Sequence, residues 1–146
     1  MADASRDRMV SEIGDGGSSS ACASEDASSK VVLSRGCDPV MAQRAGAMLP
    51  PMIGQAAVIG VTTDDEFFSL LQERKFDVVF FAPGACRYSA AHKPIPGGSH
   101  ASAGWTIADY KAKVREHQGD AAIIVETTEE RQIVPLLRKA LGLPPA

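Results

Sequence analysis

The chain of 146 residues contains no apolar run of about 18 residues, so we expect no segment of it to cross a membrane. Aromatic residues make up only 5% of it, and its net charge is −3, which argues against a basic surface for nucleic acid. Its three cysteines cannot all pair within one chain, which argues against a disulfide framework. The N-terminal segment also lacks the apolar core of a signal peptide, so we expect a cytoplasmic protein.

The first 29 residues have a different composition from the rest of the chain. They are rich in serine, contain six acidic residues against two arginines, and hold almost no bulky apolar residues. Such a segment cannot bury enough apolar surface to offset the entropy lost on ordering. We therefore predict that residues 1–29 form a disordered acidic tail and that residues 30–146 form a single α/β domain.

Short apolar runs alternate with helical patterns along the rest of the chain. The apolar runs predict strands at 30–33, 56–61, 77–81 and 121–125. Helices are predicted after each strand, at about 38–49, 63–75, 107–119 and 127–141. Asp38-Pro39 is a typical helix start, and Thr63 with Glu66 has the spacing of a capping box. Pro135 lies inside the last helical pattern and predicts either a kink or a later start.

This alternation of strand and helix predicts a parallel sheet covered by helices on both faces, a three-layer α/β/α fold. We expect four parallel strands in the order 2-1-3-4, a flavodoxin-like arrangement without its fifth strand. In that order the first and third strands are neighbours. Their carboxyl ends then lie at the edge of the sheet where such folds bind ligands.

The segment 84–104 is long for a loop and follows the most apolar strand, so it is a candidate working surface. Its cations, together with the amides of a glycine turn, are suited to an anionic group such as phosphate or carboxylate. The candidate ligand-binding residues are Arg87, His92, Lys93, Gly97, Gly98, Ser99 and His100. The alternative is a solvated, flexible loop whose histidines have no ligand.

Cys37 and Cys86 are the candidate catalytic residues. Cys37 precedes a predicted helix start, where the helix dipole favours a thiolate, and Cys86 stands beside Arg87. Because each follows one of two neighbouring strands, they either approach within reach of a disulfide or point apart as free thiols. The alternative for each is an inert residue, half-buried in a turn for Cys37 and in a loop for Cys86. No cluster has metal-ligand spacing, and the sequence indicates no particular cofactor.

The segment 60–84 resembles the second-helix and third-strand region of response-regulator receiver domains. Ala82 stands where the phosphoacceptor aspartate of those domains would be, and Ser34-Arg35-Gly36 stand where their paired acids would be. The resemblance therefore implies a receiver-like fold without transfer of phosphate to aspartate. The position of Cys37 after the first strand is similar to that of the cysteine in phosphotransferase-system IIB domains.

Two functional hypotheses follow from these patterns. The first is a non-enzymatic module that binds a small anion or a protein through the carboxyl edge of its sheet and the 84–104 segment. The second is a small thiol-dependent enzyme in which Cys37 or Cys86 is the nucleophile or redox thiol. In the second, His92 or His100 acts as base, and Arg87 holds an anionic substrate group. Neither hypothesis includes nucleic acid or a membrane as a partner.

Overall fold

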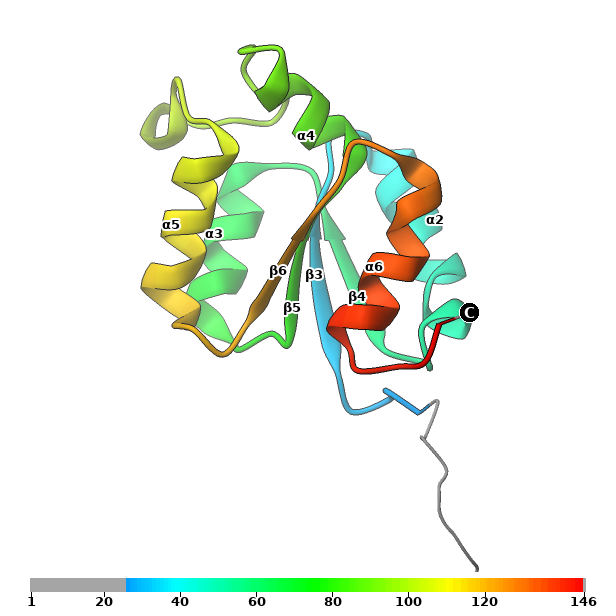
Figure 1. Cartoon of the computed structure of the whole chain (residues 1–146). Coiled ribbons are helices and arrows are strands. Elements are labelled where there is room, and N and C mark those ends of the chain that lie inside the picture. Colours follow the sequence, from blue (N-terminus) through cyan, green and yellow to red (C-terminus); the bar gives the residue numbers. More distant parts are fainter. Residues whose placement is uncertain (1–25, 146) are drawn as a thin grey trace, which may run out of the picture.

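The protein is a parallel sheet between two layers of helices (Figure 1). The computed structural model describes residues 26–145. The strands are β3 (Val31–Arg35), β4 (Ala57–Val61), β5 (Val78–Phe81) and β6 (Ile123–Glu126). The α-helices are α2 (Pro39–Met48), α3 (Asp64–Glu73), α4 (Pro83–Ala90), α5 (Ile107–Gln118) and α6 (Ile133–Ala140). Short 3-10 turns lie at η1 (Pro50–Met52), η2 (His100–Ser102) and η3 (Glu130–Gln132). Within 26–145, no helix has the length and apolar character to span a bilayer.

The strand order is β4-β3-β5-β6, and all neighbouring strands run parallel. Counted along the chain this is the predicted order 2-1-3-4, so the flavodoxin-like prediction is confirmed. β3 and β5 lie at the centre, where Leu33 is in register with Val79. All four residues of β5 are buried, as expected for a strand covered on both faces.

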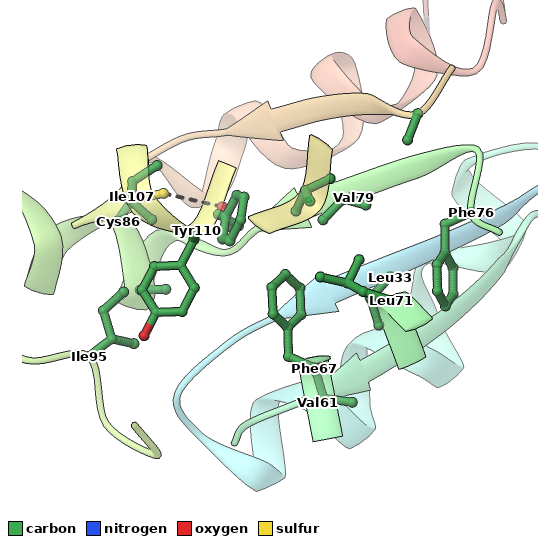
Figure 2. Close-up of a cluster of buried hydrophobic side chains, with 14 residues drawn as sticks. Leu33, Val61, Phe67, Leu71, Phe76, Val79, Cys86, Ile95, Ile107 and Tyr110 are labelled. Carbon is green, nitrogen blue, oxygen red and sulfur yellow. Dashed lines mark hydrogen bonds between the residues drawn. The ribbon is translucent and has the colours of Figure 1, made fainter. Parts of the chain in front are cut away.

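The two faces of the sheet have separate apolar cores because side chains alternate along each strand. Leu33 belongs to the core on the α3 and α5 side, whereas Val32 belongs to the core on the α2 and α6 side. Figure 2 shows the first of these cores, in which Phe67 and Tyr110 from the two helices pack near Val79 and Leu33 of the sheet. The alternation also places Arg35 on the α3 and α5 face and Ser34 on the α2 and α6 face.

Helix α2 lies close to β4 because small residues separate them. A Cβ on Gly60 would stand 3.0 Å from the carbonyl oxygen of Ala42, and one on Gly46 would stand 3.5 Å from that of Val58. No residue of α2 is fully buried, and Val40, Met41 and Met48 are exposed. The helix therefore contacts its part of the sheet through backbone and small side chains, and its large apolar side chains remain at the surface.

Helix α4 is absent from the sequence-based expectation, and α6 decides between two predicted alternatives. Residues 84–104 do not form one continuous loop, because α4 begins at Pro83 and runs through most of the first ten residues. Proline is favoured at the first position of a helix, so Ala82-Pro83-Gly84 starts a helix instead of only ending a strand. The last helix begins at Ile133 after η3, which confirms that Pro135 marks a later start.

The ordered domain begins before residue 30. Ala27 is buried in the α2 and α6 core, and its amide donates to the carbonyl oxygen of Gly54 at 2.6 Å. Residues 26–29 therefore belong to the domain, not to the tail. The predicted disorder of residues 1–25 falls outside the described residues.

A buried ion pair fixes the segment between α4 and α5. The side chains of Arg35 and Asp64 are both 0% exposed, and Arg35 donates to Asp64 Oδ1 from Nε at 3.0 Å and from Nη2 at 2.8 Å. Arg35 Nη2 also donates to the carbonyl oxygen of Pro96 at 2.8 Å. Asp64 Oδ2 accepts hydrogen bonds from the Tyr110 hydroxyl at 2.7 Å and from the Ser102 hydroxyl.

Replacing Asp64 by alanine should destabilise the domain by about 3–5 kcal/mol, because it leaves the buried guanidinium of Arg35 without its counter-ion. Asp65 is the matched control, since it lies next in the sequence on the same helical turn and is exposed. Asp65→Ala should cost less than about 1 kcal/mol, the usual contribution of an acid in a first helical turn. Urea unfolding followed by circular dichroism measures both. Equal losses in the two variants would contradict a structural role for the pair.

Candidate functional site

A cleft opens where the chain leaves β3 and β5 in opposite directions. From β3 the chain crosses to β4 on one side, and from β5 it crosses to β6 on the other, which is the topological switch point of such a sheet. The cleft measures about 190 Å³ and is lined from both loops, by Gly36 and Cys37 after β3 and by Pro83 and Gly84 after β5. We call it the switch cleft.

The walls of the switch cleft are mainly apolar. Met41, Ala45 and Leu49 line it from the α2 side, and Ile133 lines it from the start of α6. Its floor includes Ser34 of the central strand and Phe80, two residues that lie in register on β3 and β5. Ser34 is much smaller than the valines and leucine before it on β3, so it leaves space above the sheet and supplies a hydroxyl there.

Cys37 lies against the first turn of α4. A Cβ built on Gly84 would stand only 2.5 Å from Cys37 Sγ, so the glycine makes room for the thiol. Cys37 is half-buried and free. The N-cap of α4 is Ala82, whose side chain makes no capping hydrogen bond. The positive end of the helix dipole therefore faces the part of the cleft where the thiol lies.

An ion pair between Arg87 and Glu130 stands at the mouth of the cleft. Both residues line the cleft, and Arg87 donates from Nη2 to Glu130 Oε1 at 2.8 Å and from Nη1 to Oε2 at 3.2 Å. These hydrogen bonds raise the pKa of Arg87 and lower that of Glu130. The pair is exposed, so it is screened by solvent and able to exchange partners with a ligand.

Cys86 lies on the opposite side of α4 from the cleft. Its side chain is in the α3 and α5 core, 7% exposed, and its thiol donates to the carbonyl oxygen of Phe81 at 3.3 Å (Figure 2). Burial raises the pKa of the Cys86 thiol to about 11. Because the thiolate is the nucleophile, this environment opposes the catalytic role predicted for Cys86. Cys37 and Cys86 are both free thiols, so no disulfide joins them.

The predicted ligand-binding residues do not form one site. Arg87 lines the switch cleft, whereas Gly98 and Ser99 line a second cavity of about 310 Å³ beside Trp105 and Tyr110. His92, Lys93 and His100 are exposed side chains outside the linings of both cavities. Gly97 has a structural role: its φ is +82°, a Cβ there would stand 2.0 Å from the carbonyl oxygen of Thr62, and its own carbonyl accepts from Asp64 N at 2.8 Å.

Sequence reasoning missed the polar network around Asp64. The pattern from Thr63 to Glu66 indicates a helix start, and Thr63 is indeed the N-cap of α3, but the Asp64 carboxylate in its first turn faces inward to Arg35. Burial and the hydrogen bond to Asp64 raise the pKa of Tyr110 to about 12, so the phenol stays protonated as a donor. The one available signal was a charged residue, Arg35, shortly after the apolar run of the first strand. Such a residue needs a buried partner of opposite charge.

Comparisons of the chain with protein-family models, with curated proteins and with solved structures found no match. The receiver-like resemblance of segment 60–84 therefore stays a prediction. Among residues 26–145, no group of three or more His, Cys, Asp or Glu side chains is placed to hold a metal ion. What the site does is argued below from its geometry.

Iodoacetamide should distinguish the two described cysteines in a Cys22→Ser background, which removes the third thiol. At pH 8 we expect Cys37 to be alkylated in the folded protein and Cys86 to remain unmodified. The Cys86 thiol is protonated well below pH 11, so its labelling should increase only as the pH approaches that value. Peptide mass mapping measures both sites, and labelling in urea is the control in which both react. Fast labelling of Cys86 at pH 8 would contradict its burial.

Proposed function

We propose that the protein is a small-molecule binding module whose ligand occupies the switch cleft. The observation that carries this proposal is the position of the cleft: both crossover loops at the switch point contribute to it, and the small side chain of Ser34 leaves space above the sheet next to Cys37. In open α/β sheets, ligands bind in this crevice beyond the carboxyl ends of the strands. The α2 side of the sheet thus has a gap in its packing where the fold class favours a ligand.

The lining indicates the chemical class of the ligand. Met41, Ala45 and Ile133 suit an apolar body, because burying apolar surface is the main source of affinity in such clefts. The first turn of α4 and the Arg87 guanidinium suit a negatively charged or hydrogen-bond-accepting head. We therefore infer a small amphipathic ligand with an anionic head, such as a carboxylate. Arg87 would exchange Glu130 for that head group.

Thiol chemistry at Cys37 is the second candidate function. One observation favours it: Cys37 Sγ lies in the cleft against the uncapped first turn of α4. A thiol enzyme of the predicted kind also needs a general base. None of the cleft-lining residues is a histidine, and His92 and His100 are exposed on a different segment. Binding without covalent chemistry is therefore the better supported function.

We also propose a cytoplasmic location. Free Cys37 at the surface of a cleft is compatible with a reducing compartment, where such thiols persist. The half-buried thiol would be exposed to oxidation elsewhere. A protein ligand in place of a small molecule is less well supported, because the cleft measures only about 190 Å³.

Phenylacetate and its neutral isostere phenylacetamide test the proposed ligand class by amide NMR titration. We expect phenylacetate to shift the resonances of Ser34, Cys37 and Gly84 and to bind more tightly than phenylacetamide. Ala45→Phe fills the cleft and should weaken phenylacetate at least tenfold, about 1.4 kcal/mol. Ala47→Phe, on the exposed side of the same helix, is the matched control and should bind like the wild type.

The titration also separates the alternatives. Shifts centred on the Trp105 indole would place the ligand in the second cavity and contradict the proposal. Equal binding by the Ala45→Phe and Ala47→Phe variants would do the same. A stable mass increase at Cys37 after incubation with a thioester or other acyl donor, absent in Cys37→Ser, would instead support the thiol enzyme.

A further inference from the structure

Strand β6 forms one edge of the sheet and carries apolar side chains to the surface. Among residues 26–145 it pairs only with β5, so its outward N–H and C=O groups have no strand partner. Ile123 is 46% exposed. Beside the strand runs a groove of about 430 Å³, lined by all four residues of β6 and by Leu136, Lys139 and Ala140 of α6. An apolar edge of this kind is a template for pairing with another strand.

Natural proteins protect such edges with proline, bulges or charge, and β6 has little of this protection. Its four residues, Ile-Ile-Val-Glu, contain no proline and a single charge at the end. The opposite edge, β4, differs in its surroundings. The helix that follows it, α3, exposes Asp65, Glu66 and Glu73 around a groove of its own. Two copies meeting at β4 would bring these acidic faces together, so like charge opposes association there.

The side chains of β6 define how a second copy fits. Glu126 pairs with Lys111 of α5, and Ile124 also packs toward the α5 side, whereas Val125 belongs to the α6 side. A two-fold axis perpendicular to the sheet places the α5 faces of both copies on the same side of the joined sheet. Under this symmetry the two β6 strands run antiparallel, and residues that lie directly opposite each other point to the same face. Pairing centred on Ile124 satisfies this, with Ile123 opposite Val125 and Ala122 opposite Glu126 of the second copy.

This register also matches opposite charges. Arg115 of α5 donates from Nη1 to the carbonyl oxygen of Ala122 at 2.7 Å, so its guanidinium lies beside that residue. Glu126 of one copy therefore meets Arg115 of the other, and the contact occurs twice by symmetry. Centring the pair on Val125 instead would place Glu126 opposite the apolar Ile124.

We propose that β6 is a homodimer interface, through which two copies join their sheets into one eight-stranded sheet. The backbone groups of the two β6 strands satisfy each other, and the exposed Ile123 side chains bury against Val125 and the α6 residues Leu136 and Ala140 of the other copy. This surface is separate from the switch cleft, so the proposal does not depend on the proposed ligand.

Charge reversal tests the interface in the full-length chain. In a homodimer of the Glu126→Arg variant, two arginines would meet at each charge contact, and in one of the Arg115→Glu variant, two glutamates would meet there. Each variant alone should therefore be monomeric. In the heterodimer of the two variants, one contact keeps the unchanged Glu126 and Arg115, and the other brings the two substituted side chains, which have opposite charges, together. If these side chains face each other as proposed, mixing the variants should therefore give a species with the mass of two chains. Sedimentation equilibrium measures the masses, and circular dichroism checks that both variants are folded.

A second pair of variants covers the case in which Arg115→Glu fails to fold, since Arg115 also donates to the carbonyl oxygen of Gly119. Ile123→Lys changes an exposed side chain and should convert the dimer to monomer. Ala57→Lys, exposed on the β4 edge, is the matched control and should leave the dimer intact. A monomeric wild type at high concentration would overturn the proposal. A dimer that is insensitive to Ile123→Lys would also overturn it. So would a full-length chain that is monomeric and dimerises only when residues 1–25 are deleted, because that segment would then compete with the second copy.

Discussion

The buried pair of Arg35 and Asp64 is the interaction on which the carboxyl edge of the sheet depends. Burying two charges costs free energy unless their remaining hydrogen-bonding groups are satisfied. Here Arg35 donates to the carbonyl oxygens of Gly36 and Pro96 as well as to Asp64, and Asp64 accepts from Ser102 and Tyr110. One contact set thus joins the end of β3, the start of α3, the segment before α5 and α5 itself.

The pair also explains why the switch cleft lies on the other face of the sheet. Arg35 and Ser34 are consecutive on β3, so their side chains point to opposite faces. On the α3 and α5 face, the long Arg35 side chain and its partners fill the space beyond the strand ends. On the α2 and α6 face, the short side chain of Ser34 and the small residues of α2 leave the space that forms the switch cleft. The end of β3 is thus filled by Arg35 on one face of the sheet and borders the switch cleft on the other.

The sheet could be predicted from the sequence because its signals are local. Buried runs such as 78–81, and helix starts such as Asp38-Pro39, identify strands and helices one at a time, and the alternation of both restricts the topology. The polar network could not be predicted in the same way, because Arg35 and Asp64 are far apart in the sequence and their pairing depends on tertiary structure. The difference between Cys37 and Cys86 also depends on tertiary structure, because it follows from which side of α4 each thiol occupies. Helix α4 was missed because Pro83-Gly84 reads as a break.

Helix α6 contributes both to the switch cleft and to the groove beside β6. Ile133 at its start lines the switch cleft, and Leu136 and Ala140 line the groove beside β6. The helix spans only Ile133–Ala140, and a helix this short depends on tertiary packing for its stability. A second copy packed against Leu136 and Ala140 would therefore hold in place one wall of the cleft. By linkage, a ligand against Ile133 would favour the same position of α6, so occupation of either surface is expected to strengthen the other.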